Sequence, residues 1–112
     1  MTLDAGDIVL LPFPHTDLKS GKKRPALVLT DAAYHGDSLD VVLAYVTSQP
    51  QKGPWVLPVT SKDLSSGGLV KESWVRVDRL ATVEQRLVQR VAGRLAPAKM
   101  DDVKARIVRL LG

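Results

Sequence analysis

The chain has 112 residues, a length typical of one domain, and 45% of them are hydrophobic, which excludes an intrinsically disordered or fibrous protein. It contains no cysteine, which excludes a disulfide scaffold, a thiol nucleophile and a cysteine-ligated metal site and fits a reducing compartment. The net charge of +4 and the pI near 9.6 favour a polyanionic partner, either a nucleic acid or an acidic protein.

Apolar stretches are short throughout the chain. No basic N-terminal segment leads into an apolar run, and no apolar run approaches the ~18 residues of a membrane helix. We therefore expect no signal peptide, no membrane span and a cytoplasmic location. Without repeats or linker-like segments, residues 1–112 are predicted to form a single domain.

Short apolar runs separated by Pro, Gly and polar residues predict a series of strands. The first run stops at Pro12-Phe13-Pro14, and Pro58 indicates an edge strand. Residues 31–40 suit a hairpin connection, residues 61–64 one helical turn, and Gly67-Gly68 a turn. The expected strands are 8–11, 25–30, 39–47, 55–59, 74–77 and 87–95.

The C-terminal segment shows helical rather than strand periodicity. Pro97 suits a first helical position, and Asp101 and Asp102 near the start should complement the helix dipole. The apolar residues at helical spacing are Met100, Val103, Ile107, Leu110 and Leu111, with Arg106 and Arg109 near the end. The predicted fold is mainly β with a C-terminal helix, a small half-open β-barrel or roll.

The densest basic cluster is Gly21-Lys22-Lys23-Arg24-Pro25, placed in a loop just before a strand. It is either a solvated turn or an anion site. Pro25 biases Arg24 toward an extended backbone, and a guanidinium held at a strand start is a good bidentate phosphate ligand. The hydroxyls of Thr47 and Ser48 at the third strand's end either satisfy the turn backbone or donate to a phosphate oxygen.

Metal, phosphate-loop and nucleophile-elbow patterns are not apparent. The aspartates at positions 7, 17, 37, 40 and 63 are scattered, and none has a metal-ligand spacing with a histidine. The sequence therefore predicts no metal and no cofactor.

Three segments together carry a family resemblance. Residues 6–14 (GDIVLLPFP), 22–29 (KKRPALVL) and 46–49 (VTSQ), followed by 83–87 (VEQRL) and the terminal helix, resemble the MazF/PemK family of toxin endoribonucleases. The resemblance covers nearly the whole chain in order. It implies an SH3-like barrel, a homodimer bound by a cognate antitoxin, and metal-independent, sequence-specific cleavage of single-stranded RNA that inhibits growth. Contact with DNA is expected only through the antitoxin complex.

The resemblance also implies catalytic roles for Arg24 and Thr47. Some relatives carry a glutamate five residues before the arginine, where this chain has Lys19, a charge reversal. Asp17 and His15 are the candidates for acid or base chemistry, with His35 a weaker one.

The same resemblance implies that the 2′-hydroxyl attacks the adjacent phosphate. A guanidinium suits stabilisation of the transition state better than proton transfer, since lowering its pKa by ~6 units would cost about 8 kcal/mol. Arg24 is thus interpreted as a phosphate clamp and Thr47 as a hydrogen-bond donor. RNA binding is predicted for Lys22, Lys23, Ser48 and Gln49.

Two other functions remain open on the same fold. One is a non-catalytic inhibitor that binds a protein such as a topoisomerase, and the other is a nucleic-acid-binding module without cleavage. Trp55 and Trp74 are either core residues or residues of a base-stacking or dimer surface.

Overall fold

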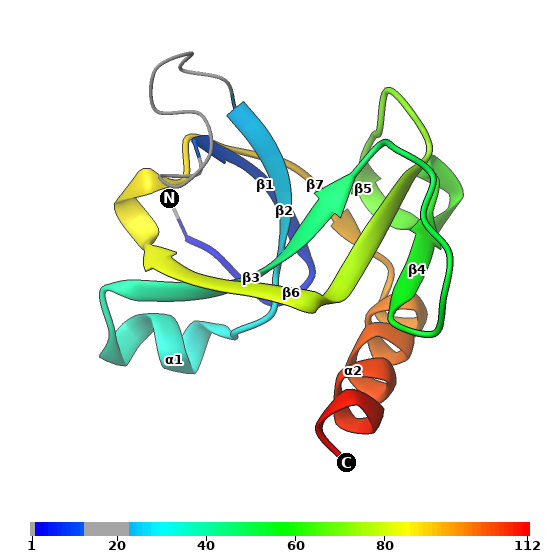
Figure 1. Cartoon of the computed structure of the whole chain (residues 1–112). Helices are drawn as coiled ribbons and strands as arrows, with labels where there is room; N and C mark the ends of the chain where they lie inside the picture. Colours follow the sequence, from blue (N-terminus) through cyan, green and yellow to red (C-terminus); the bar gives the residue numbers. More distant parts are fainter. Residues whose placement is uncertain (1, 13–22) are drawn as a thin grey trace.

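The computed structural model describes residues 2–12 and 23–112 (Figure 1). Over these ranges the backbone forms one seven-stranded antiparallel sheet that curls into a half-barrel, with the spatial order β4-β6-β3-β2-β1-β7-β5. The strands are β1 (Asp7–Pro12), β2 (Lys23–Val28), β3 (Asp40–Thr47), β4 (Val56–Val59), β5 (Leu64–Gly67), β6 (Ser73–Glu84) and β7 (Arg90–Leu95), and the helices are α1 (Ala32–Asp37) and α2 (Pro97–Leu111), with 3-10 turns η1 (Ser61–Asp63) and η2 (Gln85–Leu87). This architecture confirms the predicted fold class.

Apolar side chains are buried on both faces of the central strands. One cluster lies between the sheet and α2 and includes Ile8, Leu27, Val77, Met100 and Val103. The other fills the opposite face and includes Leu3, Val9, Leu11, Val28, Val41, Leu43 and Val83. Because neighbouring residues of β1 point to opposite faces, both clusters draw on this one strand, which explains its almost uninterrupted apolar sequence.

The C-terminal helix α2 confirms the helix that the spacing of apolar residues predicted. Met100 and Val103 are buried against the sheet, and Pro97 occupies the first helical position. The expectation for Asp101 and Asp102 is wrong, because the first turn contains no acidic residue and the helix dipole acts mainly within that turn.

The connection between β2 and β3 is also corrected. The two strands pair as antiparallel neighbours, but α1 lies between them instead of an irregular hairpin loop. The Asp31 side chain caps α1 by accepting a hydrogen bond from the Tyr34 amide at 3.1 Å. An N-cap aspartate followed by two alanines favours a helix over a turn.

Three strands in the second half of the chain differ from the expected elements. Residues 74–77 are only the start of β6, which continues to Glu84, and β7 begins at Arg90 because residues 85–87 form η2. The polar strand β5 was not predicted at all. Gly67 is the last residue of β5 and not simply a turn residue. It pairs with Gly93 of β7, and the two backbones are too close there for a side chain.

The strand β6 carries a three-residue insertion relative to its neighbour β3. Tyr45 pairs with Arg76 and Ala44 pairs with Leu80, so residues 77–79 have no partners in β3. Val77 is fully buried, and its amide donates to the Trp55 carbonyl at 3.0 Å. Figure 1 shows β6 bending between its two halves, and such bulges are known to redirect side chains.

We expect Gly67→Ala to destabilise the fold by roughly 1–3 kcal/mol, measured by urea unfolding. Gly67 has φ +75°, and a Cβ there would lie 2.2 Å from the Ala92 carbonyl oxygen and 2.4 Å from the Gly93 Cα. Gly68→Ala is the matched control, because a Cβ at Gly68 meets nothing within 4 Å. Equal unfolding midpoints for the two variants would contradict the close approach of β5 and β7.

Candidate active site

Arg24 lies within β2, opposite Leu11 of β1, and not in a loop before the strand. This corrects the predicted boundary, while the extended backbone expected from the following proline is confirmed. The strand begins earlier than predicted because β1 continues to Pro12, which pairs with Lys23. A side chain on a paired strand is held more firmly than one on a loop, which suits a charged ligand group.

Thr47 ends β3 and approaches Arg24 from the neighbouring strand. The β2–β3 pairing ends at Ala26 and Tyr45, so Arg24 and Thr47 each lie two residues beyond the last pair of this ladder. The Thr47 Oγ1 accepts a hydrogen bond from the Gln49 amide at 3.1 Å. The hydroxyl thus satisfies the turn backbone, one of its two predicted roles. The second role is compatible with this, because the oxygen acts as acceptor and the hydroxyl proton can still be donated to a ligand.

Arg24 and Thr47 line one cavity of about 260 Å³. Two more arginines, Arg76 and Arg79, reach the same cavity from the two ends of the β6 insertion. The remaining lining residues are Pro25, Tyr45, Val46 and Gln51. Three guanidinium groups around one cavity make it suited to a polyanion such as a nucleic-acid backbone.

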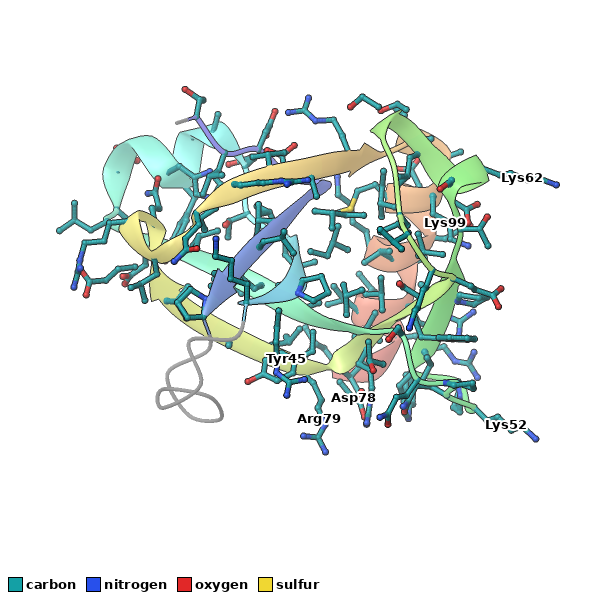
Figure 2. The ribbon with its side chains drawn as sticks, turned by 90° about the horizontal axis from the view of Figure 1, so that it is seen from above. Tyr45, Lys52, Lys62, Asp78, Arg79 and Lys99 are labelled. Carbon is teal, nitrogen blue, oxygen red and sulfur yellow. The ribbon has the colours of Figure 1, made fainter. Side chains whose placement is uncertain are left out.

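Asp78 and Arg76 form a bidentate ion pair beside this cavity. The Arg76 Nε donates to Asp78 Oδ1 at 3.1 Å and its Nη2 donates to Oδ2 at 2.8 Å. These hydrogen bonds lower the pKa of the Asp78 carboxyl and raise the pKa of the Arg76 guanidinium. Figure 2 shows Tyr45, Asp78 and Arg79 grouped on one side of the molecule. The site therefore holds an ionised carboxylate near neutral pH.

The other sequence-predicted residues separate into two groups. Lys23 is exposed on β2 and does not line the cavity, Ser48 lines a neighbouring cavity, and Gln49 contributes its amide to Thr47. His15, Asp17 and Lys22, together with Lys19, lie outside the described residues.

His35 has a structural setting in α1. Its Nδ1 is 2.8 Å from the Leu3 carbonyl oxygen and its Nε2 is 2.7 Å from Thr30 Oγ1. Among described residues it lines a cavity beside η2 and not the one that contains Arg24. The fold therefore does not bring His35 together with Arg24 and Thr47, and both of its ring nitrogens serve to hold α1 in place.

Trp55 and Trp74 are both half-buried. Trp55 packs against the core beneath α2, with the Arg109 guanidinium 5.7 Å from its ring centroid. Of the two alternatives for Trp55, the packing role is the one that the structure shows.

Arg76, Asp78 and Arg79 were missed as site residues. The sequence signal for them is a break in the strand pattern. Apolar and polar residues alternate up to Val77, but two charged residues, Asp78 and Arg79, then follow in succession before Leu80. A polar pair inside a strand-like run is typical of a bulge, and bulges occur often beside active sites.

Within residues 2–12 and 23–112, no cluster of three or more His, Asp or Glu side chains is placed to hold a metal ion. One of the scattered aspartates, Asp7, is instead buried in an ion pair, accepting from Arg94 Nε at 2.8 Å and from the Asp4 amide at 2.9 Å. Nor is any helix in the described part of the chain long and apolar enough to cross a membrane.

The fold and the site together define a small β half-barrel with an arginine-lined cavity at the end of its central strands. A family model for the PemK-like, MazF-like toxins of type II toxin–antitoxin systems matches residues 4–111. The chain belongs to this family, as its sequence resemblance indicated.

Solved structures agree with this assignment. MazF from Deinococcus radiodurans is 27% identical, with 100% of this chain and 98% of that chain covered and a TM-score of 0.76. An endoribonuclease from a mycobacterial species, in complex with its cognate antitoxin, is 17% identical, with 98% and 95% covered and a TM-score of 0.77. The Mycobacterium tuberculosis toxin MazF-mt6 is 21% identical, with 94% and 95% covered and a TM-score of 0.76. The last two show the fold alone. No curated protein matches the sequence.

We expect Arg76→Gln to raise the pKa of Asp78 toward the ordinary aspartate value, because the two hydrogen bonds that favour its ionised form are removed. Carboxyl-carbon NMR titration measures this directly. Arg86→Gln is the matched control: Arg86 holds Glu84 with the same spacing and lowers its pKa, so that variant should shift Glu84 and leave Asp78 unchanged. An unmoved Asp78 titration in Arg76→Gln would contradict the pairing.

Proposed function

We propose that this chain is an endoribonuclease toxin that cleaves single-stranded RNA at a specific short sequence without a metal ion. The observation that carries the proposal is the convergence of Arg24, Thr47, Arg76 and Arg79 on one cavity in a member of this toxin family. Mycobacterial proteins described as endoribonucleases share the fold, so this half-barrel is a scaffold on which such an activity occurs.

The proposed reaction is internal transfer at phosphorus. The ribose 2′-oxygen forms a bond to phosphorus, the bond from phosphorus to the 5′-oxygen breaks, and the products are a 2′,3′-cyclic phosphate and a 5′-hydroxyl. Negative charge builds up on the phosphate oxygens in the transition state. Arg24 and the Thr47 hydroxyl, already positioned by β2 and β3, stabilise that charge without reorganising.

A proton must leave the 2′-hydroxyl during the attack. Within the described part of the chain, Asp78 is the carboxylate that borders the arginine cluster, because it shares a neighbouring cavity with Tyr45, Arg76 and Arg79. We assign it as the proton acceptor, ionised at neutral pH through its pair with Arg76, while the departing 5′-oxygen takes a proton from solvent. Asp17 and His15 remain predictions in the segment outside the described residues.

The proposal includes the partners of such a toxin. Structures of MazF from Deinococcus radiodurans include complexes with MazE, and the mycobacterial endoribonuclease is bound to its cognate antitoxin. By analogy we propose a cognate antitoxin for this chain, a homodimeric toxin, DNA contact only through the toxin–antitoxin complex, growth inhibition by the free toxin and a cytoplasmic location.

Arg24→Ala should retain the fold and lower the cleavage rate of single-stranded RNA by about 10²–10³-fold, the usual cost of one transition-state donor. Purified protein, mixed-sequence RNA and excess chelator provide the assay, with the melting temperature as the fold check. Lys23→Ala is the neighbouring control and should weaken RNA binding slightly with little change in kcat. Wild-type protein that shifts RNA but leaves it intact would instead indicate a binding module, and an inert wild type would favour inhibition of a protein target.

Arg24→Lys should also be severely impaired in kcat/KM, although the charge is retained, because an ammonium lacks the planar fork that binds two phosphate oxygens at once. Single-turnover kinetics at saturating RNA separate this effect from weaker binding. Near-normal turnover in this variant would show that a point charge is sufficient.

A further inference from the structure

A second cavity adjoins the one that contains Arg24 and Thr47. It has a volume of about 370 Å³ and shares Pro25 with the first cavity. The chain passes directly from Thr47, which lines the first cavity, to Ser48, which lines the second. The two cavities are therefore neighbours on either side of the ends of β2 and β3.

The sheet register connects this second cavity to a cation. Pro25 pairs with Leu10, and Leu10 pairs with Arg90 on the next strand. Directly opposed residues share a face of a sheet, so these three form a row running from the edge of the candidate active site to a guanidinium. Lys71, in the segment between β5 and β6, supplies a second cation to the same cavity.

The lining has the chemistry of a site for a flat, partly polar ligand. Leu10, Pro25 and Leu69 supply apolar surface, and two serine hydroxyls supply polar groups. Ser73 is buried, and its Oγ donates to the Lys71 carbonyl at 3.1 Å, which leaves its oxygen to accept a hydrogen bond. Apolar walls with a few polar groups are typical of small-molecule subsites of ~300–1,000 Å³.

We propose that the second cavity binds an unpaired RNA base next to the scissile phosphate, and that Lys71 and Arg90 bind the phosphate that follows this base. The inference rests on the proposed function and assigns a specificity subsite to it. Bases of single-stranded RNA are splayed apart when proteins read them, and a strand passing around Pro25 places neighbouring nucleotides on opposite sides of the β2–β3 end. The base edge meets Ser48 and Ser73, so the cavity contributes to sequence selection.

Paired charge variants test the phosphate binding. Lys71→Gln/Arg90→Gln should weaken binding of a 2′-O-methyl oligonucleotide, which cannot be cleaved. It should also reduce the slope of log K against log salt by about 0.7, because one phosphate charge is no longer neutralised. Lys62→Gln/Lys104→Gln removes the same charge from exposed positions outside both cavities and should change the slope much less. Fluorescence anisotropy at several salt concentrations gives both slopes.

Abasic substrates test the base subsite. With wild-type protein, removing the base at one position flanking the cleavage site should lower kcat/KM about tenfold, while removal at distant positions should have little effect. In Lys71→Gln/Arg90→Gln the same abasic substitution should cost clearly less, because the base and its phosphate bind as one unit and the two changes are not additive.

A second variant guards against indirect effects. Val70 is fully exposed at the cavity, so Val70→Asp should leave stability unchanged and repel the strand, while Leu39→Asp, also exposed, makes the same charge change near α1. If wild-type protein cleaves RNA and both cavity variants match their controls in salt slope and abasic penalty, the subsite is overturned and the proposed function stands. If the cavity variants cleave RNA normally but no longer bind the antitoxin, the base subsite is overturned and the cavity is a protein-docking surface. A wild type that cleaves no RNA overturns the proposed function itself.

Discussion

The insertion of three residues in β6 is the constraint on which the candidate site depends. Val77 is buried and its amide is paired with the Trp55 carbonyl, so the extra residues cannot relax into a regular ladder. The charged residues beside this anchor are not buried, and Arg76 and Arg79 line the cavity that also contains Thr47 at the end of β3. Core packing thus fixes the position of groups that would otherwise repel one another on a flat strand.

The positive charge of the three arginines at the site is partly offset by one carboxylate, that of Asp78. Asp78 neutralises Arg76 through two hydrogen bonds and holds its planar group in one orientation. Arg24 and Arg79 approach from β2 and from the far end of the insertion. The cavity is therefore lined by guanidinium groups and has one carboxylate beside it, an arrangement that suits phosphate binding.

Much of this molecule could be predicted from local patterns. Apolar runs predicted β1 to β4, and an apolar period of about 3.6 residues predicted α2. Both patterns arise locally, because a strand buries one or both faces and a helix buries one. Arg24 and Thr47 could be singled out because both lie near recognisable strand ends and because the family resemblance implies a role for each. Arg76 and Arg79 were not, since their meeting with Arg24 depends on a register shift between β3 and β6, and pairing register is a long-range property. Strand β5 was missed for a similar reason, because it depends on Gly67 approaching a distant strand.

Pro25 has one more consequence, which follows from its missing amide proton. The Leu29 amide donates to the Val42 carbonyl of β3. Amide direction alternates along a strand, so an amide proton at position 25 would also point toward β3 and extend the ladder. A proline ring ends that ladder, and the β2–β3 pairing stops at Ala26. Both cavities open where the ladder ends. The boundary between the two cavities therefore depends on the ring of Pro25, which does not titrate. The charged contacts around it, in contrast, respond to pH and ionic strength.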